Sequence, residues 1–151
     1  MPLQALADRD VDQDVLDTRA PSVGALFRNR VRATPDAPAY LYFAEGSSEL
    51  TTLTWRQTYD IVEQWAAGLV SLGVELEDRV AIASTTRVEW ILADLAVICA
   101  GGATTTVYPT TMAEDVAYIL ADSGSGVVFA EDEEQVAKLQ LVRSEVPGCG
   151  R

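Results

Sequence analysis

The sequence contains no histidine and only one lysine, Lys138. Without histidine, neither a Ser-His-Asp triad nor a histidine-ligated zinc site can be built from this chain. No glycine precedes the lysine, so the glycine-rich P-loop, whose lysine reaches a bound phosphate, is also absent. We therefore assign no catalytic, cofactor-binding or metal-binding residue from these motifs.

Long apolar runs and cysteines are also scarce. No uncharged apolar run reaches the roughly eighteen residues that a membrane-spanning helix needs, so we expect no transmembrane segment. The N-terminus is acidic and lacks the apolar core of a signal peptide. Two cysteines, Cys99 and Cys149, do not make a disulfide framework. The expected location is the cytoplasm.

Basic residues are outnumbered, with 11 Lys and Arg against 23 Asp and Glu, which gives a formal net charge of −12. Nucleic acid binding needs a basic footprint, so a nucleic acid partner is not expected, and an anionic membrane is disfavoured for the same reason. The charge indicates either a solvated surface or an acidic docking surface. Consecutive carboxylates at Glu131–Glu134 are interpreted as the solvated start of a helix rather than as a metal site.

The hydrophobic content is 48% in 151 residues, enough for one folded domain with a real core. Three short apolar, β-branched runs are predicted to be strands, at Val80–Ala83, Thr104–Tyr108 and Val127–Ala130. None alternates cleanly between apolar and polar residues, which is typical of parallel strands covered on both faces. The fold class is therefore α/β, a partial doubly wound and mostly parallel sheet with flanking helices.

Two helices are expected between these strands. Thr86 stands three residues before Glu89, and Thr111 stands three before Glu114, so each pair is predicted to form a capping box. The first helix should end at Gly101-Gly102 and be buried nearly all round, with Trp90 in the core. The second should end near Gly124.

A helix and a β-hairpin are expected to precede this layer. The helix begins after Ser22, the hairpin pairs Ala39–Phe43 with Leu50–Leu53, and a further helix is capped by Thr54 with Gln57. Trp65 on that helix is expected in the core. Residues 1–20 are predicted to be an acidic flexible tail and residues 21–151 the folded domain, with a last helix capped by Asp132 and broken by Pro147-Gly148.

Glycine-rich segments flank two of the strands, but both close a helix and lead into a strand, which is the reverse of a dinucleotide-binding fingerprint. Tyr108 and Thr110 follow a strand at its carboxyl end, where open α/β sheets bind ligands. These two residues are therefore our candidate substrate-adjacent positions, with an ordinary strand-to-helix turn as the alternative.

The order of the motifs resembles the N-terminal part of AMP-forming acyl-CoA synthetases, in the adenylate-forming superfamily. The resemblance runs from about Ser22 to about Val146 and includes L-T-W-R-Q-T-Y, G-L-V-S-L-G-V-E-L-E-D-R-V-A-I and E-W-I-L-A-D-L-A-V-I-C-A-G-G-A. The Glu89-Trp90 pair and the segment V-Y-P-T look most like the long-chain fatty acid–CoA ligase branch.

The resemblance implies a reaction in which ATP and magnesium convert a fatty acid to an acyl-adenylate, from which CoA then displaces AMP. Fatty acid, ATP and CoA are the implied partners of the full-length family. The family's Ser/Thr/Gly-rich phosphate loop, its adenylate-binding motifs and its catalytic lysine have no counterpart here, so no cofactor site is expected in these residues. Some relatives contact a CoA phosphate through arginines just after the strand that matches Val127–Ala130, where this chain has acidic residues.

Three hypotheses remain open. The first is an N-terminal piece of a long-chain fatty acid–CoA ligase, truncated before the phosphate loop and inactive alone, with self-association through an exposed sheet edge. The second is a non-catalytic binding or interaction module derived from the same fold. The third is an unrelated small α/β protein, such as a flavodoxin-like one, which would need a phosphate-cradling loop where the sequence offers only S-T-T-R-V-E.

Overall fold

A computed structural model describes Asp14 and residues 17–146 of the chain. Most of the predicted acidic tail, the predicted helix break at Pro147-Gly148 and Cys149 lie outside the described residues. Within the described part, no helix combines the length and the apolar character needed to cross a bilayer.

A three-stranded parallel sheet forms the centre of the structure. β3 (Arg79–Ala83) lies between β4 (Ala103–Val107) and β5 (Val127–Ala130), and both neighbours run parallel to it. Residues 80–83 of β3 are at most 1% exposed, because helices cover both faces of the strand. The predicted strands and their parallel arrangement are confirmed.

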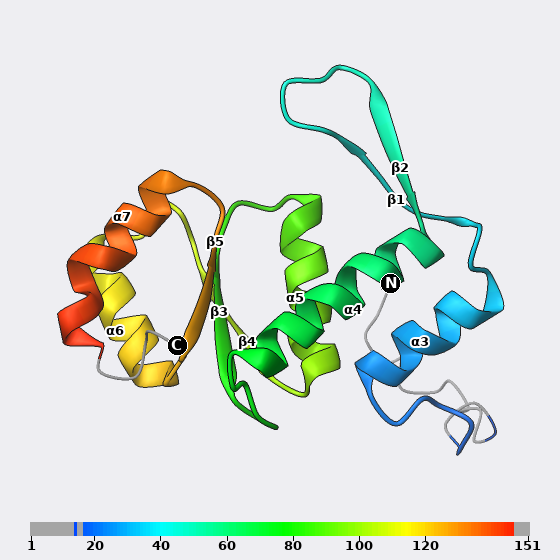
Figure 1. Ribbon diagram of the computed structural model, residues 1–151, viewed down its shortest axis with the longest axis horizontal. Helices are drawn as coiled ribbons and strands as arrows, with labels where there is room; N and C mark the ends of the chain where they lie inside the picture. The colour runs from blue at the N-terminus through cyan, green and yellow to red at the C-terminus, as the bar shows by residue number, and fades with distance from the viewer. Residues whose placement is uncertain (1–13, 15–16, 147–151) are drawn as a thin grey trace, which may run out of the picture.

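Helices lie on both faces of this sheet, as a doubly wound layer requires (Figure 1). α4 (Trp55–Ser71) and α5 (Val88–Ala100) cover one face, while α6 (Ala113–Ser123) and α7 (Glu133–Val142) cover the other. A short 3₁₀ turn, η1 (Arg143–Glu145), follows α7. α3 (Val23–Ala33) packs on α4 and α5, farther from the sheet.

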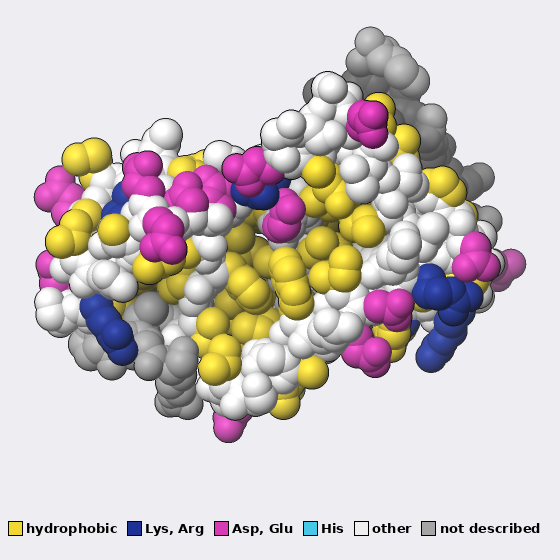
Figure 2. Space-filling model, turned by 45° about the horizontal axis from the view of Figure 1, so that its top comes forward, with side chains coloured by type: hydrophobic (Ala, Val, Ile, Leu, Met, Phe, Trp, Pro, Cys, Tyr) yellow, Lys and Arg dark blue, Asp and Glu magenta, His cyan; other side chains and the backbone are white. Residues whose placement is uncertain are grey.

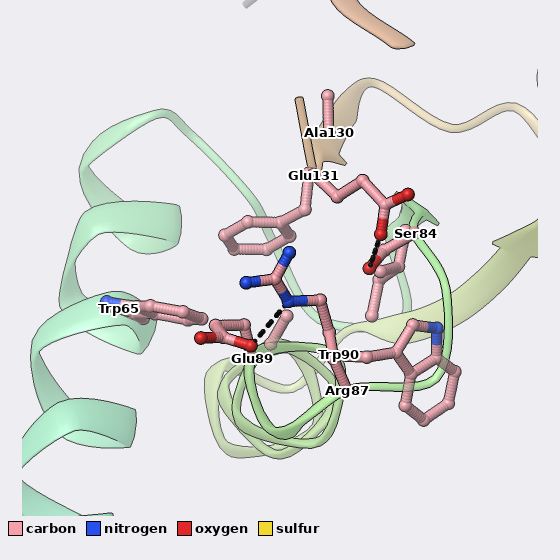
Figure 3. A pocket seen from close by; sticks show the side chains of 10 residues that line it. Trp65, Ser84, Arg87, Glu89, Trp90, Ala130 and Glu131 are labelled. Carbon is pink, nitrogen blue, oxygen red and sulfur yellow. Dashed lines mark hydrogen bonds and ion pairs between the residues drawn. The ribbon is translucent and has the colours of Figure 1, made fainter. Parts of the chain in front are cut away.

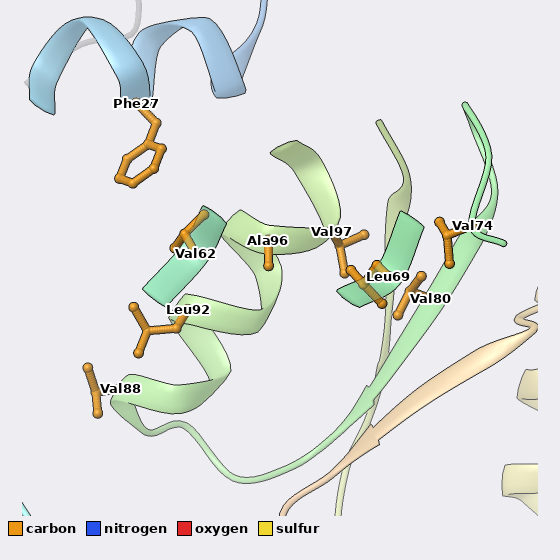
Figure 4. Close-up of a cluster of buried hydrophobic side chains, with 9 residues drawn as sticks. All are labelled: Phe27, Val62, Leu69, Val74, Val80, Val88, Leu92, Ala96 and Val97. Carbon is orange, nitrogen blue, oxygen red and sulfur yellow. The ribbon is translucent and has the colours of Figure 1, made fainter. Parts of the chain in front are cut away.

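Two hydrophobic clusters hold these layers together. The larger one joins α3, α4, α5 and β3, and Figure 4 shows its buried side chains converging between the helices and the sheet. The smaller one joins β3 and β4 to α6 and α7 through small residues such as Ala81 and Ala83. Cys99 has a free thiol and is half-buried at the edge of the larger cluster.

The predicted hairpin is confirmed. β1 (Pro38–Phe43) pairs antiparallel with β2 (Leu50–Thr54), with an irregularity near Pro38. The hairpin projects from the body of the molecule (Figure 1) and leaves Leu41, Phe43 and Leu50 mostly exposed. Its loop is tied to the sheet layer by an ion pair between Glu45 and Arg87.

Helix starts agree with the sequence prediction at three positions. Thr54 and Gln57 form the full capping box of α4, in which each side chain bonds the backbone N–H of the other residue. Ser22 and Asp132 accept backbone N–H bonds at the starts of α3 and α7. The predicted ends of α5 and α6 are confirmed as well, since Gly101 and Gly124 terminate them with φ of 90° and 68°.

The two capping boxes predicted for α5 and α6 are wrong. Arg87 and Met112 are the N-cap residues, and neither makes a side-chain capping bond. Each helix therefore begins one residue later than the pattern requires, and the threonine lies before the cap rather than on it. The carboxylate of Glu89 pairs with Arg87 instead.

Candidate functional site

The connections that leave β3 and β5 pass to opposite faces of the sheet. The chain leaves β3 for α5 on one face, and it leaves β5 for α7 on the other. Adjacent strands whose connections diverge in this way open a crevice at their carboxyl ends, which is where open α/β sheets bind ligands. A pocket of about 210 Å³ lies at this point, lined by Trp65, Ile82, Ser84, Arg87, Glu89, Trp90, Ala93, Phe129, Ala130 and Glu131.

Aromatic side chains form one wall of this pocket. Trp65 of α4 stacks on Phe129 of β5, with ring centroids 5.8 Å apart and planes 27° apart. Trp90, in the first turn of α5, also lines the pocket and is only half-buried. The prediction that Trp90 belongs to the core is therefore wrong, whereas Trp65 does pack against the larger core cluster.

An ion pair between Arg87 and Glu89 borders the pocket next to these rings. The guanidinium of Arg87 bonds the carboxylate of Glu89 at 2.6 Å and lies 3.6 Å from Glu45 of the hairpin loop. The hydrogen bond lowers the pKa of Glu89 and raises the pKa of Arg87. In Figure 3 this pair lies between Trp65 and the contact of Glu131 with Ser84, while Figure 2 shows hydrophobic side chains filling a hollow beneath acidic and basic groups.

Glu131 holds the loop that follows β3 through hydrogen bonds. One oxygen of its carboxylate accepts hydrogen bonds from the backbone N–H and the hydroxyl of Thr85, both at 2.7 Å, and from the hydroxyl of Ser84 at 3.0 Å. Partial burial alone would raise the pKa of Glu131, but the bonds from Thr85 and Ser84 and the charge of Arg87 hold this pKa below its ordinary value. Sequence reasoning treated Glu131 as one of four solvated carboxylates and missed this role.

The predicted substrate-adjacent residues lie at a neighbouring edge. Tyr108 is 70% exposed, Thr110 is also exposed, and neither lines the pocket. Their turn is held by Lys138, whose ammonium donates to the carbonyl of Pro109 and to the side-chain oxygen of Gln135. Lys138 is half-buried in these contacts, and a substrate role for Tyr108 and Thr110 stays a prediction.

The polar side chains of the pocket are bonded to one another. The hydroxyl of Ser84 is bonded to Glu131 and to the carbonyl of Thr85, and the carboxylate of Glu131 is a weak base because its pKa lies below the ordinary value. Among the described residues, no cluster of three or more His, Cys, Asp or Glu could hold a metal ion. What the arrangement offers is an apolar surface of aromatic rings under a neutralised ion pair.

The profile of the family described as "AMP-binding enzyme" matches residues 27–149. The chain belongs to this family. It is 34% identical over 126 residues to the long-chain-fatty-acid–CoA ligase FadD15 of Mycobacterium bovis, covering 83% of this chain and 21% of that protein. It is 33% identical over 128 residues to the long-chain-fatty-acid–CoA ligase heimdall of Drosophila melanogaster, covering 83% of this chain and 19% of the relative.

Solved structures show the same fold. The N-terminal domain of FACL13 from Mycobacterium tuberculosis, in an inhibitor-bound crystal structure, superimposes with a TM-score of 0.75 at 23% identity, covering 85% of this chain and 32% of that one. The described layer thus has the fold of one part of the N-terminal domain of adenylate-forming enzymes. The chain spans about a fifth of the length of these curated relatives.

Proposed function

We propose that this chain supplies the first α/β layer of a long-chain fatty acid–CoA ligase and does not catalyse adenylation by itself. In the proposed full reaction, the fatty acid carboxylate attacks the α-phosphorus of ATP and releases pyrophosphate. The thiol of CoA then attacks the acyl carbon and releases AMP.

One observation supports this proposal most strongly. The match to long-chain fatty acid–CoA ligases covers most of the chain, yet the sequence contains no glycine-rich loop that ends in lysine. Phosphoryl chemistry needs cationic groups positioned around the phosphates. The single lysine, Lys138, is already bonded to the Pro109 carbonyl on the α6–α7 side of the sheet.

The test is carboxylate-dependent exchange between ATP and pyrophosphate. The purified 151-residue chain should give no exchange above a buffer control with a long-chain fatty acid, while a full-length relative such as FadD15 should be active in the same assay. Exchange by the chain that disappears in a Lys138→Ala variant would overturn the proposal, because it would place the reaction on these residues.

A second candidate is a non-catalytic binding module of the same fold. It is favoured by a groove along α4 that is lined by arginines at one end and by apolar side chains at the other. Binding in this groove would require no adenylation motif.

A further inference from the structure

Two hollows meet along α4, away from the pocket at the sheet edge. The first, here called the cationic hollow, has a volume of about 460 Å³ and is lined by Arg28 and Arg32 of α3 and by Arg56 of α4. The second, the apolar hollow, has a volume of about 300 Å³. Arg28 and Tyr59 line both hollows, so the two form one groove, and none of its residues lines the pocket beside Trp90.

The arginines of the cationic hollow are available to a ligand. Arg28 and Arg32 stand one helical turn apart on the same flank of α3, and no ion pair with either is found among the described residues. Like charges at this spacing disfavour each other, so an anion between them relieves the repulsion. Arg56 is paired at 3.3 Å with Asp36, but both side chains are largely exposed, and such a pair holds its members weakly.

This concentration of positive charge is unusual for the molecule. Three of its eleven Lys and Arg residues line one hollow of a chain with a net charge of −12. Figure 2 shows basic side chains gathered at the end of the molecule where α3 lies. Asp60 also lines the cationic hollow, and Glu63 accepts the hydroxyl hydrogen of Tyr59 at 3.0 Å, so acidic groups border the arginines.

The apolar hollow continues from Arg28 along α4 to its C-terminal end. Its surface consists mainly of small apolar side chains, at Ala66, Ala67, Val70 and Ala100, over the buried Val62. Val70 is 57% exposed. The eleven steps along α4 from Tyr59 to Val70 rise roughly 16 Å at 1.5 Å per step, a span that a medium-length acyl chain covers.

We propose that this groove binds one molecule of a single-chain anionic amphiphile, with a phosphate headgroup on Arg28, Arg32 and Arg56 and the acyl chain along the apolar hollow. Guanidinium groups suit phosphate because their N–H groups donate pairs of charge-assisted hydrogen bonds. The source is a dissolved monomer rather than a bilayer. The arginines converge on a concave site from two helices, and the net charge of −12 repels an anionic membrane.

The headgroup end is tested by calorimetry with dodecyl phosphate below its micelle-forming concentration. Saturable one-to-one binding is expected, and Arg28→Gln and Arg32→Gln should each weaken it about tenfold, as the loss of a charge-assisted hydrogen bond does. Arg143→Gln is the matched control, since it makes the same charge change on η1 and should leave the affinity unchanged. Equal weakening in all three variants would mean that only net charge matters, and no weakening would remove the arginines from the site; either result overturns the proposal.

The apolar end has its own variants and probes. Val70→Glu should weaken dodecyl phosphate binding strongly, whereas Leu141→Glu, at an exposed position of α7, should not. Inorganic phosphate and dodecyltrimethylammonium should both bind far more weakly than dodecyl phosphate. Binding of inorganic phosphate or the cationic amphiphile with equal affinity, or preferential binding to anionic phospholipid vesicles in flotation, would contradict the proposed ligand. Circular dichroism confirms that each variant is folded.

Discussion

The hydrogen bonds of Glu131 distinguish it from the three acidic residues that come next in the chain. Its carboxylate holds Ser84 and Thr85, and with them the loop that carries Arg87 over the pocket. Among its neighbours, Asp132 caps α7, and Glu134 lies on the exposed surface, where its side chain makes no hydrogen bond or ion pair with another described residue. The stability of the loop should therefore depend on the charge state of Glu131.

Glu131→Gln should destabilise the protein by about 1 kcal/mol at neutral pH, because hydrogen bonds to a charged, partly exposed acceptor become weaker neutral ones. The pKa of Glu131 is lower in the folded than in the unfolded chain, so this contribution is complete above the unfolded pKa and is lost as the pH falls through the folded pKa. Urea unfolding of both proteins across pH 3–7 measures the difference, with Glu134→Gln as the control. A difference that does not change with pH would contradict the account.

Single residues were also the hardest feature to predict from the sequence. Trp90 occurs in a nearly uncharged helix, which favours a core position, yet it falls in the first turn beside the pocket. Tyr108 and Thr110 are predicted from their place after a strand, and the structure puts them after the edge strand β4, outside the pocket, so their substrate role stays a prediction. The sequence shows where strands end, whereas the order of strands in the sheet is set by long-range packing.

At the scale of elements, the sequence predicted the strands closely, because a short apolar, β-branched run with turn residues at both ends fits few secondary structures other than a strand. Helix starts were less predictable. The pattern of threonine three residues before an acidic or amide residue occurs at α4, α5 and α6, but only α4 begins at the threonine. A one-residue shift is enough to separate the side chain from the N–H groups that it would cap.

This difference predicts that two similar substitutions change the free energy of unfolding by different amounts. Thr54→Ala removes the capping box of α4 and should lower the free energy of unfolding by about 1 kcal/mol, since the N–H of Gln57 loses its acceptor. Thr86→Ala should leave stability within about 0.5 kcal/mol, because its exposed side chain caps nothing. Chemical denaturation of the two variants checks this. A larger loss for Thr86→Ala would place the start of α5 one residue earlier.

At the scale of the whole molecule, the layer keeps unpaired edges. Within the described residues, β5 pairs only with β3, and all four of its residues are partly exposed. A separate pocket of about 360 Å³, distinct from the groove along α4, lies beside β5 and is lined in part by Val128, Val136 and Leu139. An open strand edge beside apolar surface favours pairing with another chain, while a net charge of −12 opposes it.

The central claim, that these residues form the first layer of a larger fold, is tested most directly by light scattering across a salt series at fixed protein concentration. Salt screens the repulsion, with a Debye length of about 8 Å at physiological ionic strength. The account predicts that self-association grows with added salt and that a neutral hydrophobic dye such as Nile red binds to the uncovered surface. A monomer that stays compact at high salt and binds no dye would contradict it, and would favour a layer that is complete as a self-standing module.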